Sequence, residues 1–357
     1  NSGLLQREIV LYQRLIKEYG VKVQFITYGD DSDHEFIDSS SGIELVPIYS
    51  YMKMPKNKYI KLMQTILIPW RLKKEIKSSN ILKTNQMLGS WVAVIAKIMF
   101  KKSLILRGGY EIYSHTLRAK KNLIHKFFIY SISLLSYKIS ERIHVATNDD
   151  KKFVVKNFNI NPEKVFIYPN WIDVDKFKTN KTIKNNNKLL FVGRLNSVKN
   201  IDLLIKALVG TDITLDIVGN GELKGELIRL AKTLKVNINF YGNIPNSKMP
   251  SIYNQYRIYV LCSSYEGNPK TLLEAMACGC SVIGTAVPGI KQVILNNQTG
   301  LLVEEDVESL KSTIKLLLAD KALQKELGKN ASLYIKENNS LDNAITYEMT
   351  AYNKTIA

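Results

Sequence analysis

The chain has 357 residues, a formal net charge of +18, and 45% hydrophobic and 23% charged residues. This composition excludes a disordered chain, and the length exceeds what one hydrophobic core usually supports, so we expect two folded domains. The three cysteines are too few for a disulfide framework, which favours a reducing compartment such as the cytoplasm. The stretch Cys278-Gly279-Cys280 lacks a second ligand pair at metal-binding spacing, so we expect packing residues there and no metal.

The first half of the chain alternates helical and strand patterns. Apolar residues recur at helical spacing up to Gly20, and the run over 21–27 predicts a strand. Doubly wound domains open with a strand and a glycine-rich turn, so we expect that a first strand precedes residue 1. Further strands are expected near residues 43–48, 80–84, 103–107, 142–146 and 164–168.

Positive charge is concentrated between residues 51 and 142, where 19 Lys and Arg stand against three acids. Two apolar and aromatic stretches, 59–70 and 127–135, lie in the same region. Both are shorter than the roughly 20 apolar residues that span a bilayer. They suit helices that rest on an anionic membrane surface, or helices that face the core and present lysines to water. The sequence leaves both interpretations open.

A polar run over 179–188 is interpreted as a linker, and a second strand–helix alternation follows it. This pattern in both halves favours an α/β protein of two parallel domains, each with its ligand edge at the carboxyl ends of its strands. We expect domains over 1–170 and 171–340 with the active site in the cleft between them, and a helix over 341–357 packing back on the first domain. Strands in the second half are expected near 188–193, 213–218, 238–241, 258–262, 281–284 and 300–303.

Two cations follow the first of these strands. Gly193 permits a tight exit from the strand, and Asn200 is expected to cap the helix that comes next. Arg194 and Lys199 place positive charge beside that helix end, which suits a diphosphate leaving group that gains charge as its bond to a sugar breaks. Either residue alone is typical of a basic surface, but the two on one strand–helix turn favour a function.

Two glutamates, eight positions apart, frame the stretch Glu266-Gly267-Asn268-Pro269-Lys270-Thr271-Leu272-Leu273-Glu274. It follows an apolar run that predicts a buried parallel strand, and Pro269 suits the first position of a helix. Such a turn directs free backbone amides at a phosphate or a polyol. Carboxylates accept hydrogen bonds from vicinal hydroxyls, so Glu266 and Glu274 suit different parts of one sugar nucleotide.

Two further loops in this half have weaker signals. The glycines of Val218-Gly219-Asn220-Gly221 let the backbone approach a ligand, although a plain turn explains them equally well. In Tyr241-Gly242-Asn243-Ile244 the isoleucine suits contact with a flat base. Both loops follow expected strands, so they belong to the same ligand edge as the cations and the glutamates.

The order of these motifs resembles glycosyltransferase family 4, the group 1 transferases. The resemblance covers essentially the whole second half, from Pro169-Asn170-Trp171-Ile172-Asp173 to Asn297-Gln298-Thr299-Gly300. It implies the GT-B fold, in which two Rossmann-like, doubly wound parallel-sheet domains flank an interdomain cleft. It also implies a retaining enzyme that transfers a sugar from a nucleoside diphosphate.

The resemblance implies roles by position. Arg194 and Lys199 would hold the donor diphosphate, Glu266 would contact the transferred sugar, and Glu274 would accept from the ribose hydroxyls. Retention in this family would proceed by front-face attack, with the donor phosphate taking the acceptor proton, so no protein base, metal or cofactor is implied. The donor-binding residues would be Gly193, Gly219, Asn220, Ile244, Gly267, Asn268, Pro269, Lys270, Thr271 and Glu274.

The sequence departs from the family pattern in three places. Trp171 replaces a usual glycine, and Gln292 stands where glutamate is frequent. Many members carry a histidine after a central strand of the first half, where this chain has Leu106-Arg107-Gly108-Gly109-Tyr110-Glu111-Ile112 and a histidine four residues after the glutamate. Gly3 resembles the end of a glycine-rich acceptor-side loop. The acceptor-side candidates are therefore Gly3, Arg107, Glu111 and His115.

Three other classes compete with this interpretation. A metal-dependent transferase would need an Asp-x-Asp pair, but Asp31-Ser32-Asp33 and Asp173-Val174-Asp175 are better explained by chance. A retaining glycoside hydrolase uses two carboxylates about 5–5.5 Å apart, but the neighbouring cations fit a nucleotide better than a bare glycoside. A nucleic-acid-binding protein would explain the basic charge, but no zinc module or helix-turn-helix pattern accompanies it.

The sequence therefore predicts a metal-independent, retaining hexosyltransferase that moves a sugar from a UDP- or GDP-sugar to a saccharide acceptor. We expect a lipid-linked acceptor and a role in bacterial surface polysaccharide (lipopolysaccharide or capsule) biosynthesis. We also expect a cytoplasmic location, with the basic first domain peripheral on the anionic inner face of the cell membrane, and no nucleic-acid partner. The alternative is a soluble acceptor, as in sucrose- or starch-type synthases of the same fold.

Overall fold

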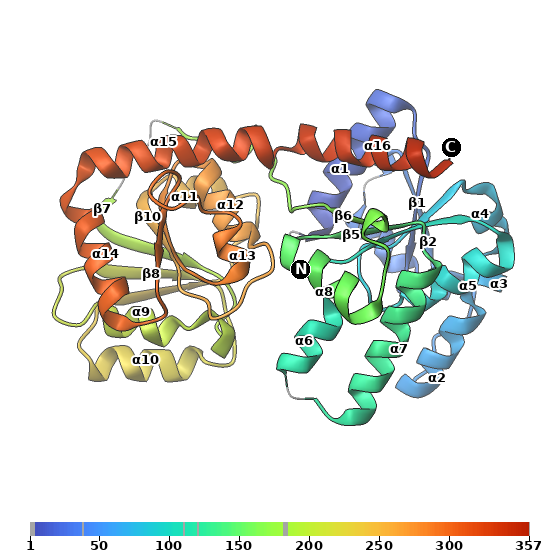
Figure 1. Cartoon of the computed structure of the whole chain (residues 1–357), viewed down its shortest axis with the longest axis horizontal. Coiled ribbons are helices and arrows are strands. Elements are labelled where there is room, and N and C mark those ends of the chain that lie inside the picture. The colour runs from blue at the N-terminus through green and yellow to red at the C-terminus, as the bar shows by residue number, and fades with distance from the viewer. Residues whose placement is uncertain (1–3, 38, 110, 120, 181–184, 357) are drawn as a thin grey trace. The chain divides into compact units, whose positions relative to one another are not determined.

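The computed structural model describes residues 4–37, 39–109, 111–119, 121–180 and 185–356 (Figure 1). Contacts divide the chain into two units, each described by itself. The N-terminal unit is Gly3–Tyr168 with Ala344–Ala357, and the C-terminal unit is Pro169–Asn343. The strands of both units pair in parallel, as the alternating strand and helix patterns predict.

The N-terminal unit has a two-stranded sheet, β1-β2, and a four-stranded sheet, β3-β4-β5-β6. Its strands lie within two residues of the predicted ranges. Its elements are α1 (Leu4–Tyr19), β1 (Val23–Thr27), β2 (Ile43–Pro47), α2 (Lys58–Gln64), α3 (Ile68–Arg71), α4 (Lys73–Ser78), β3 (Ile81–Lys83), α5 (Ser90–Phe100), β4 (Ser103–Arg107), α6 (Ile112–Arg118), α7 (Leu123–Ile139), β5 (Arg142–Val145), α8 (Asn148–Phe158), β6 (Val165–Ile167) and α16 (Leu341–Ile356), with short 3-10 turns that include η1 (Asp31–Phe36) and η4 (Thr65–Leu67).

The C-terminal unit has one six-stranded sheet of order β12-β11-β10-β7-β8-β9. From the other edge this is the doubly wound order 3-2-1-4-5-6, in which the chain starts at the centre and later returns to it. Its elements are β7 (Asn185–Val192), α9 (Ile201–Ala207), β8 (Thr214–Val218), α10 (Lys224–Thr233), β9 (Ile238–Gly242), α11 (Met249–Tyr253), β10 (Tyr256–Leu261), α12 (Lys270–Ala277), β11 (Ser281–Thr285), α13 (Pro288–Lys291), β12 (Leu301–Val303), α14 (Val307–Ala319) and α15 (Lys321–Asn338).

The core of the C-terminal unit explains why its strands were predictable. Leu189, Leu190 and Phe191 of β7 have no exposed surface, and neither do Tyr259 and Val260 of β10. Helices cover both faces of a doubly wound sheet, so successive side chains of a central strand are buried on alternate faces. The sequence of such a strand is therefore a continuous apolar run. This buried centre holds the carboxyl ends of β7 and β10 at fixed positions.

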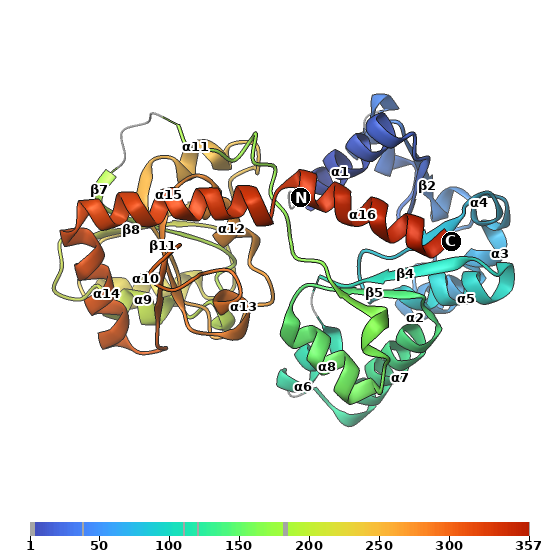
Figure 2. The same cartoon turned by 45° about the horizontal axis from the view of Figure 1, so that its top comes forward.

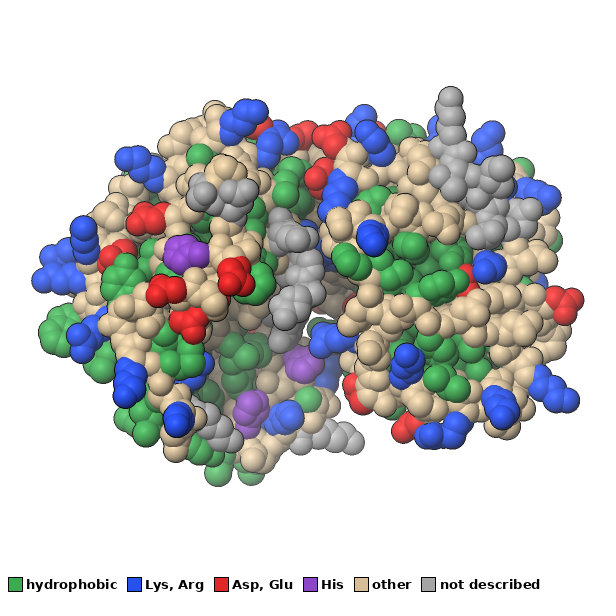
Figure 3. Space-filling view, turned by 180° about the vertical axis from the view of Figure 1, so that it is seen from behind, with side chains coloured by type: hydrophobic (Ala, Val, Ile, Leu, Met, Phe, Trp, Pro, Cys, Tyr) green, Lys and Arg blue, Asp and Glu red, His purple; other side chains and the backbone are tan. Residues whose placement is uncertain are grey.

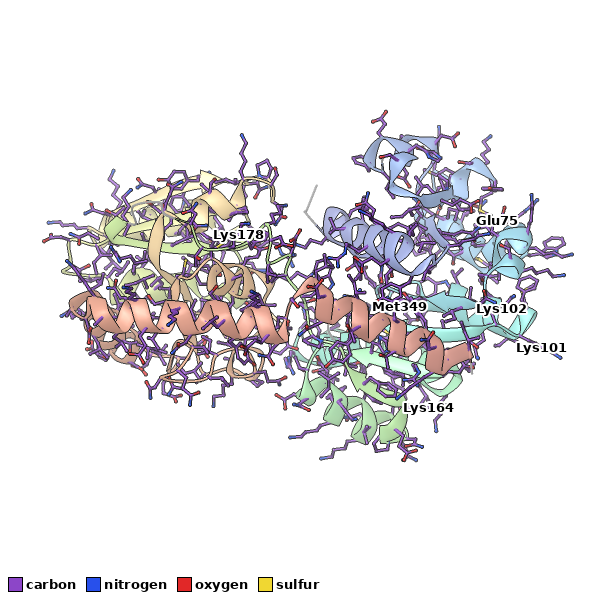
Figure 4. All side chains as sticks on the ribbon, turned by 90° about the horizontal axis from the view of Figure 1, so that it is seen from above. Glu75, Lys101, Lys102, Lys164, Lys178 and Met349 are labelled. Carbon is purple, nitrogen blue, oxygen red and sulfur yellow. The ribbon has the colours of Figure 1, made fainter. Side chains whose placement is uncertain are left out.

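Helix α16 is part of the N-terminal unit from Ala344 onward. Figures 1 and 2 both show it alongside α1, and Figure 4 labels Met349 on it. Its Glu348 is fully buried and forms an ion pair with Lys83, whose Nζ also donates to Tyr12 Oη over 3.0 Å. Burial by itself raises the pKa of Glu348, but the Lys83 and Arg107 cations lower it to about 2. This buried ion pair fixes α16 to the sheet.

Three local predictions differ from the structure. The predicted linker over 179–188 overlaps β7, because Asn185 already pairs with Tyr256 of β10, while residues 181–184 lie outside the described residues. Pro269 is the N-cap residue of α12 and not its first helical residue. Asn200 occupies the N-cap position of α9 in a left-handed conformation, but its side chain donates to Glu305 and does not cap the helix.

The buried histidine of β5 generates a prediction on acid stability. His144 stacks on Tyr168 with a 5.4 Å centroid distance, and burial lowers its pKa to about 3. An unfolded histidine takes up a proton near pH 6.5, so the native state loses about 1.4 kcal/mol per pH unit as pH falls from 6.5 towards 3. Replacing it by His144→Phe should therefore remove about 2 kcal/mol of the stability loss between pH 6.5 and 5.

Denaturant unfolding at both pH values measures this difference. His125→Phe, at an exposed position of α7, is the matched control and should keep the pH dependence of the unmodified chain. Equal pH dependence of His144→Phe and the unmodified chain would contradict the assignment of a neutral buried imidazole.

Candidate active site

The site lies where the strand order of the C-terminal sheet reverses. Strand β7 pairs with β8 on one side and with β10 on the other, and the chain leaves β7 and β10 in opposite directions across the sheet. Loops at the carboxyl ends of two such strands diverge and leave a crevice, which is where ligands bind in open α/β sheets. The loop after β7 contains Arg194 and Lys199, and the loop after β10 contains Glu266.

A lysine–glutamate ion pair joins these two loops. Lys199 Nζ lies 2.5 Å from Glu266 Oε1, and the two side chains are 18% and 11% exposed. Ser263 Oγ donates to the same oxygen over 2.6 Å, and the Ser264 amide donates to the Val198 carbonyl over 2.9 Å. Oε1 of the carboxylate thus holds the cation, while Oε2 accepts no hydrogen bond from the described residues and is available to a ligand.

Arg194 provides the second cation of the loop after β7. The side chain is exposed, and within the described part of the chain it forms no hydrogen bond or ion pair. Its neighbours hold the backbone in place: the Gly193 amide donates to the Val218 carbonyl and the Leu195 amide to the Asn220 carbonyl, each over 3.0 Å. The guanidinium is therefore free to bind an anion on a backbone that is already ordered.

Gly219 sets how closely the loops after β7 and β8 approach. It has a φ of +137°, and a Cβ atom there would lie 1.8 Å from the Gly193 carbonyl oxygen. Only glycine fits such a contact. Its amide donates to the Gly242 carbonyl over 2.7 Å, so the third loop, which leads to Ile244, is joined as well. Ile244 is partly buried against the core, and Asn220 is exposed beside Gly219.

The loop after β10 is held from both sides. Asn170 donates through its amide to Asn268 Oδ1 over 3.0 Å and through Nδ2 to the Asn268 carbonyl over 2.5 Å. On the other side, a Cβ on Gly289 would lie 2.1 Å from the Gly267 carbonyl oxygen. Pro269 is buried, and Thr271 Oγ1 in the first turn of α12 accepts from Tyr259 over 2.9 Å. Lys270, the first residue of α12, is partly buried.

Glu274 lies one turn into α12 and is only 1% exposed. Its carboxylate accepts from Asn246 Nδ2 over 3.2 Å and from Tyr253 Oη over 2.9 Å. Burial raises the pKa of Tyr253 well above its ordinary value, and the negative charge of Glu274 raises it further. The phenol therefore stays protonated and remains a hydrogen-bond donor. Sequence reasoning missed Asn246, because no motif marks it as a partner of a residue far along the chain.

The acceptor-side candidates have different surroundings in the N-terminal unit. Arg107 is buried, forms an ion pair with Glu8 of α1 over 3.0 Å and stacks on Tyr168. Burial lowers the pKa of Arg107, but nearby groups, the Glu8 carboxylate foremost, raise it above its ordinary value. Glu111 is the N-cap of α6 and accepts from the Ser114 amide and the Tyr137 hydroxyl. His115 is exposed on α6, and Gly3 lies outside the described residues.

Glu111 also lines a small cavity with His144 at the carboxyl ends of β4 and β5. Its volume of about 10 Å³ is near the lower limit for holding one water molecule. The predicted acceptor roles of these four residues stay predictions. The two Asp-x-Asp strings make local contacts: Asp33 accepts from the Thr27 hydroxyl, and Asp173 accepts from the backbone amides of residues 175 and 176.

Comparison with known proteins shows the family to which the chain belongs. The family model described as glycosyl transferases group 1 matches residues 173–333, which contain every loop of the site. An uncharacterized glycosyltransferase from Methanocaldococcus jannaschii is 30% identical over 273 residues, covering 71% of this chain and 68% of that protein. The chain belongs to the group 1 glycosyltransferases.

Other relatives and structures extend this result. The N-acetylgalactosamine-N,N'-diacetylbacillosaminyl-diphospho-undecaprenol 4-alpha-N-acetylgalactosaminyltransferase of Campylobacter jejuni is 32% identical over 66% of each chain. Sucrose-phosphate synthase from Thermosynechococcus elongatus has a TM-score of 0.82 at 18% identity, covering 98% of this chain and 92% of that one. Anabaena HepE in complex with UDP has a TM-score of 0.80 at 14% identity, covering 99% and 98%. These structures show the GT-B fold of this glycosyltransferase, while the cleft between its domains stays a prediction.

The contact between α13 and the loop after β10 generates a testable prediction. In Gly289→Ala the new methyl group would meet the Gly267 and Glu266 carbonyls, so the loop that carries Glu266 must move. A displacement of about 1 Å can cost about 10²-fold in rate, so turnover of a nucleotide sugar should fall by that order while circular dichroism stays native. Gly225→Ala is the matched control, because its nearest contact is Arg229 Nη1 at 3.8 Å. Equal activity of both variants would contradict the role given to this contact.

Proposed function

We propose that this chain is a retaining member of glycosyltransferase family 4 that transfers a hexose from a nucleoside diphosphate sugar to a lipid-linked saccharide. The observation that carries the proposal is the Lys199–Glu266 ion pair at the reversal of strand order, with Arg194 beside it. Two cations and a carboxylate, whose second oxygen has no partner within the described residues, thus share the carboxyl ends of β7 and β10. A diphosphate joined to a sugar presents anionic oxygens and hydroxyls in that same arrangement.

Each residue of the pair has a separate part in the proposed reaction. Lys199 and Arg194 would bind the diphosphate and stabilise the charge that develops as its bond to the sugar breaks. Glu266 would keep Lys199 in place through Oε1 and accept from a sugar hydroxyl through Oε2. Attack from the front face, with the departing phosphate taking the acceptor proton, would give retention without a protein base.

The nucleoside part of the donor would lie over the loops after β8 and β9. Gly219 and Asn220 present backbone at the sheet edge, and Ile244 adds an apolar surface for the base. Glu274 is buried beneath this region, so contact with a ribose requires that its carboxylate exchange a protein donor for a ribose hydroxyl. We propose to test UDP first, because Anabaena HepE, which shares the fold, has been solved in complex with UDP.

The acceptor is inferred from the relatives. The Campylobacter transferase acts on a saccharide linked to undecaprenol diphosphate, and this supports a lipid-linked acceptor for the present enzyme. The proposal places the enzyme in the cytoplasm at the inner face of the cell membrane, in the synthesis of a bacterial surface polysaccharide such as lipopolysaccharide or capsule. A soluble acceptor, as in sucrose-phosphate synthase, is the alternative, but that likeness concerns the fold alone.

Removing the lysine of the ion pair tests the proposal. Lys199→Ala should lower turnover by about 10²–10³, because a fixed donor at a departing charge is lost. The double variant Lys199→Ala/Glu266→Ala should lose less turnover than the product of the losses in the two single variants, because the two residues act as a unit. Release of nucleoside diphosphate from the donor in the presence of acceptor measures both.

Lys206→Ala is the matched control, because Lys206 forms an exposed ion pair with Asp202 in the same region of the chain. It should leave turnover within about twofold of the unmodified enzyme. Near-normal turnover of Lys199→Ala, with the control behaving as expected, would remove the lysine from the mechanism.

We further propose that the reaction needs no metal, because Arg194 and Lys199 provide the positive charge that a diphosphate leaving group requires. Turnover should then persist in excess EDTA at the rate seen without it. Loss of turnover in EDTA, restored by Mg²⁺ or Mn²⁺, would contradict this part of the proposal.

A further inference from the structure

The first turns of α7 expose large apolar side chains. Leu123, Ile124 and Phe127 are 80%, 82% and 73% exposed, whereas Ile129 and Ser133 further along the helix are buried. Only the later part of α7 therefore packs in the core. Neighbouring exposed apolar residues of this kind mark a surface that binds a protein, a membrane or a ligand.

A second exposed apolar group lies on α2, η4 and α3. Met63, Ile66 and Trp70 are 69%, 53% and 62% exposed, and the buried residues Ile68 and Pro69 hold this segment on the unit. The break between α2 and α3 falls at Thr65, whose hydroxyl donates to the Leu62 carbonyl over 2.5 Å and accepts from the Trp91 indole over 2.8 Å. The exposed apolar side chains lie on both sides of this break, with Met63 before it and Ile66 and Trp70 after it.

Both groups belong to one part of the N-terminal unit. Helix α5 packs against α3, η4 and α7, so the two segments share a neighbour. In Figure 1, α2 and the first turns of α7 extend to the same lower end of this unit. In Figure 3, where the unit is on the left, hydrophobic and basic side chains stand together along its lower outline.

The same region is strongly basic. Residues 51–142 contain 19 Lys and Arg and only three acids. Of these acids, Glu111 is buried and Glu141 pairs with Lys97, which leaves Glu75. Described lysines and arginines within four positions of the exposed apolar side chains in the sequence are Lys61, Arg71, Lys73, Lys74, Lys121 and Lys126.

We infer that these two groups form a membrane-docking surface, made of Met63, Ile66, Trp70, Leu123, Ile124 and Phe127 with their flanking lysines. Exposed apolar side chains flanked in the sequence by cations suit an anionic bilayer, in which acyl chains lie beneath a layer of negative headgroups. No helix of the described residues is long and apolar enough to cross a membrane, and this surface needs none. The inference rests on the proposed function for its purpose, because a lipid-linked acceptor would lie in that bilayer.

Vesicle flotation with the whole chain tests the inference. The chain should float with vesicles of phosphatidylglycerol and phosphatidylcholine, and binding should weaken when salt is raised from 0.05 to 0.5 M, because screening shortens the reach of the lysines. The double variant Ile124→Glu/Phe127→Glu should bind at least about tenfold more weakly, since each apolar side chain becomes an anion. Ile228→Glu/Leu316→Glu is the matched control, because those residues are 45% and 55% exposed in the C-terminal unit.

Stabilisation by UDP, measured by thermal unfolding, separates this inference from the proposed function. All variants should keep the stabilisation of the unmodified chain, because the substituted residues lie outside the donor loops. The inference is overturned if the unmodified chain does not float with anionic vesicles, or if both double variants float equally well. Floating that depends on the α7 residues, in a chain that no nucleotide stabilises, would support the surface and count against the proposed function.

Discussion

The ion pair between Lys199 and Glu266 is the interaction on which the proposed donor site depends. It joins two loops that lie 67 positions apart in the sequence, at the point where β7 and β10 pair. Without a ligand, opposite charges at this crevice neutralise each other, so neither is left as an unpaired, partly buried charge. A diphosphate sugar can replace both partners at once, since its anionic oxygens suit the lysine and its hydroxyls suit the glutamate.

The glycines of the site limit how the loops can move. Gly219 of the loop after β8 lies against Gly193 of the loop after β7, and Gly289 of α13 lies against Gly267 of the loop after β10. Closely packed segments transmit strain, so a change at one of these segments must displace the segment that it contacts. This packing explains how the cations after β7 and the carboxylate after β10 keep a fixed spacing.

The sequence predicted those parts of the fold that depend on local patterns. The strands of the second half were found because residues such as Leu189-Leu190-Phe191 are apolar in succession, as a sheet buried on both faces requires. The start of β7 was missed because Asn185 and its neighbours are polar, and pairing with β10 overrides that preference. Long-range partners were also missed: Glu8 for Arg107 and Glu348 for Lys83 are contacts that no local spacing encodes.

A structure of the chain with a bound nucleoside diphosphate sugar tests the central claim most directly. We expect the diphosphate at the carboxyl ends of β7 and β10, with Arg194 and Lys199 on its oxygens and Glu266 on the sugar. We also expect that Lys199 turns from Glu266 towards the phosphate. A nucleotide bound elsewhere on the chain, with the Lys199–Glu266 pair intact and no phosphate near Arg194, would contradict the account.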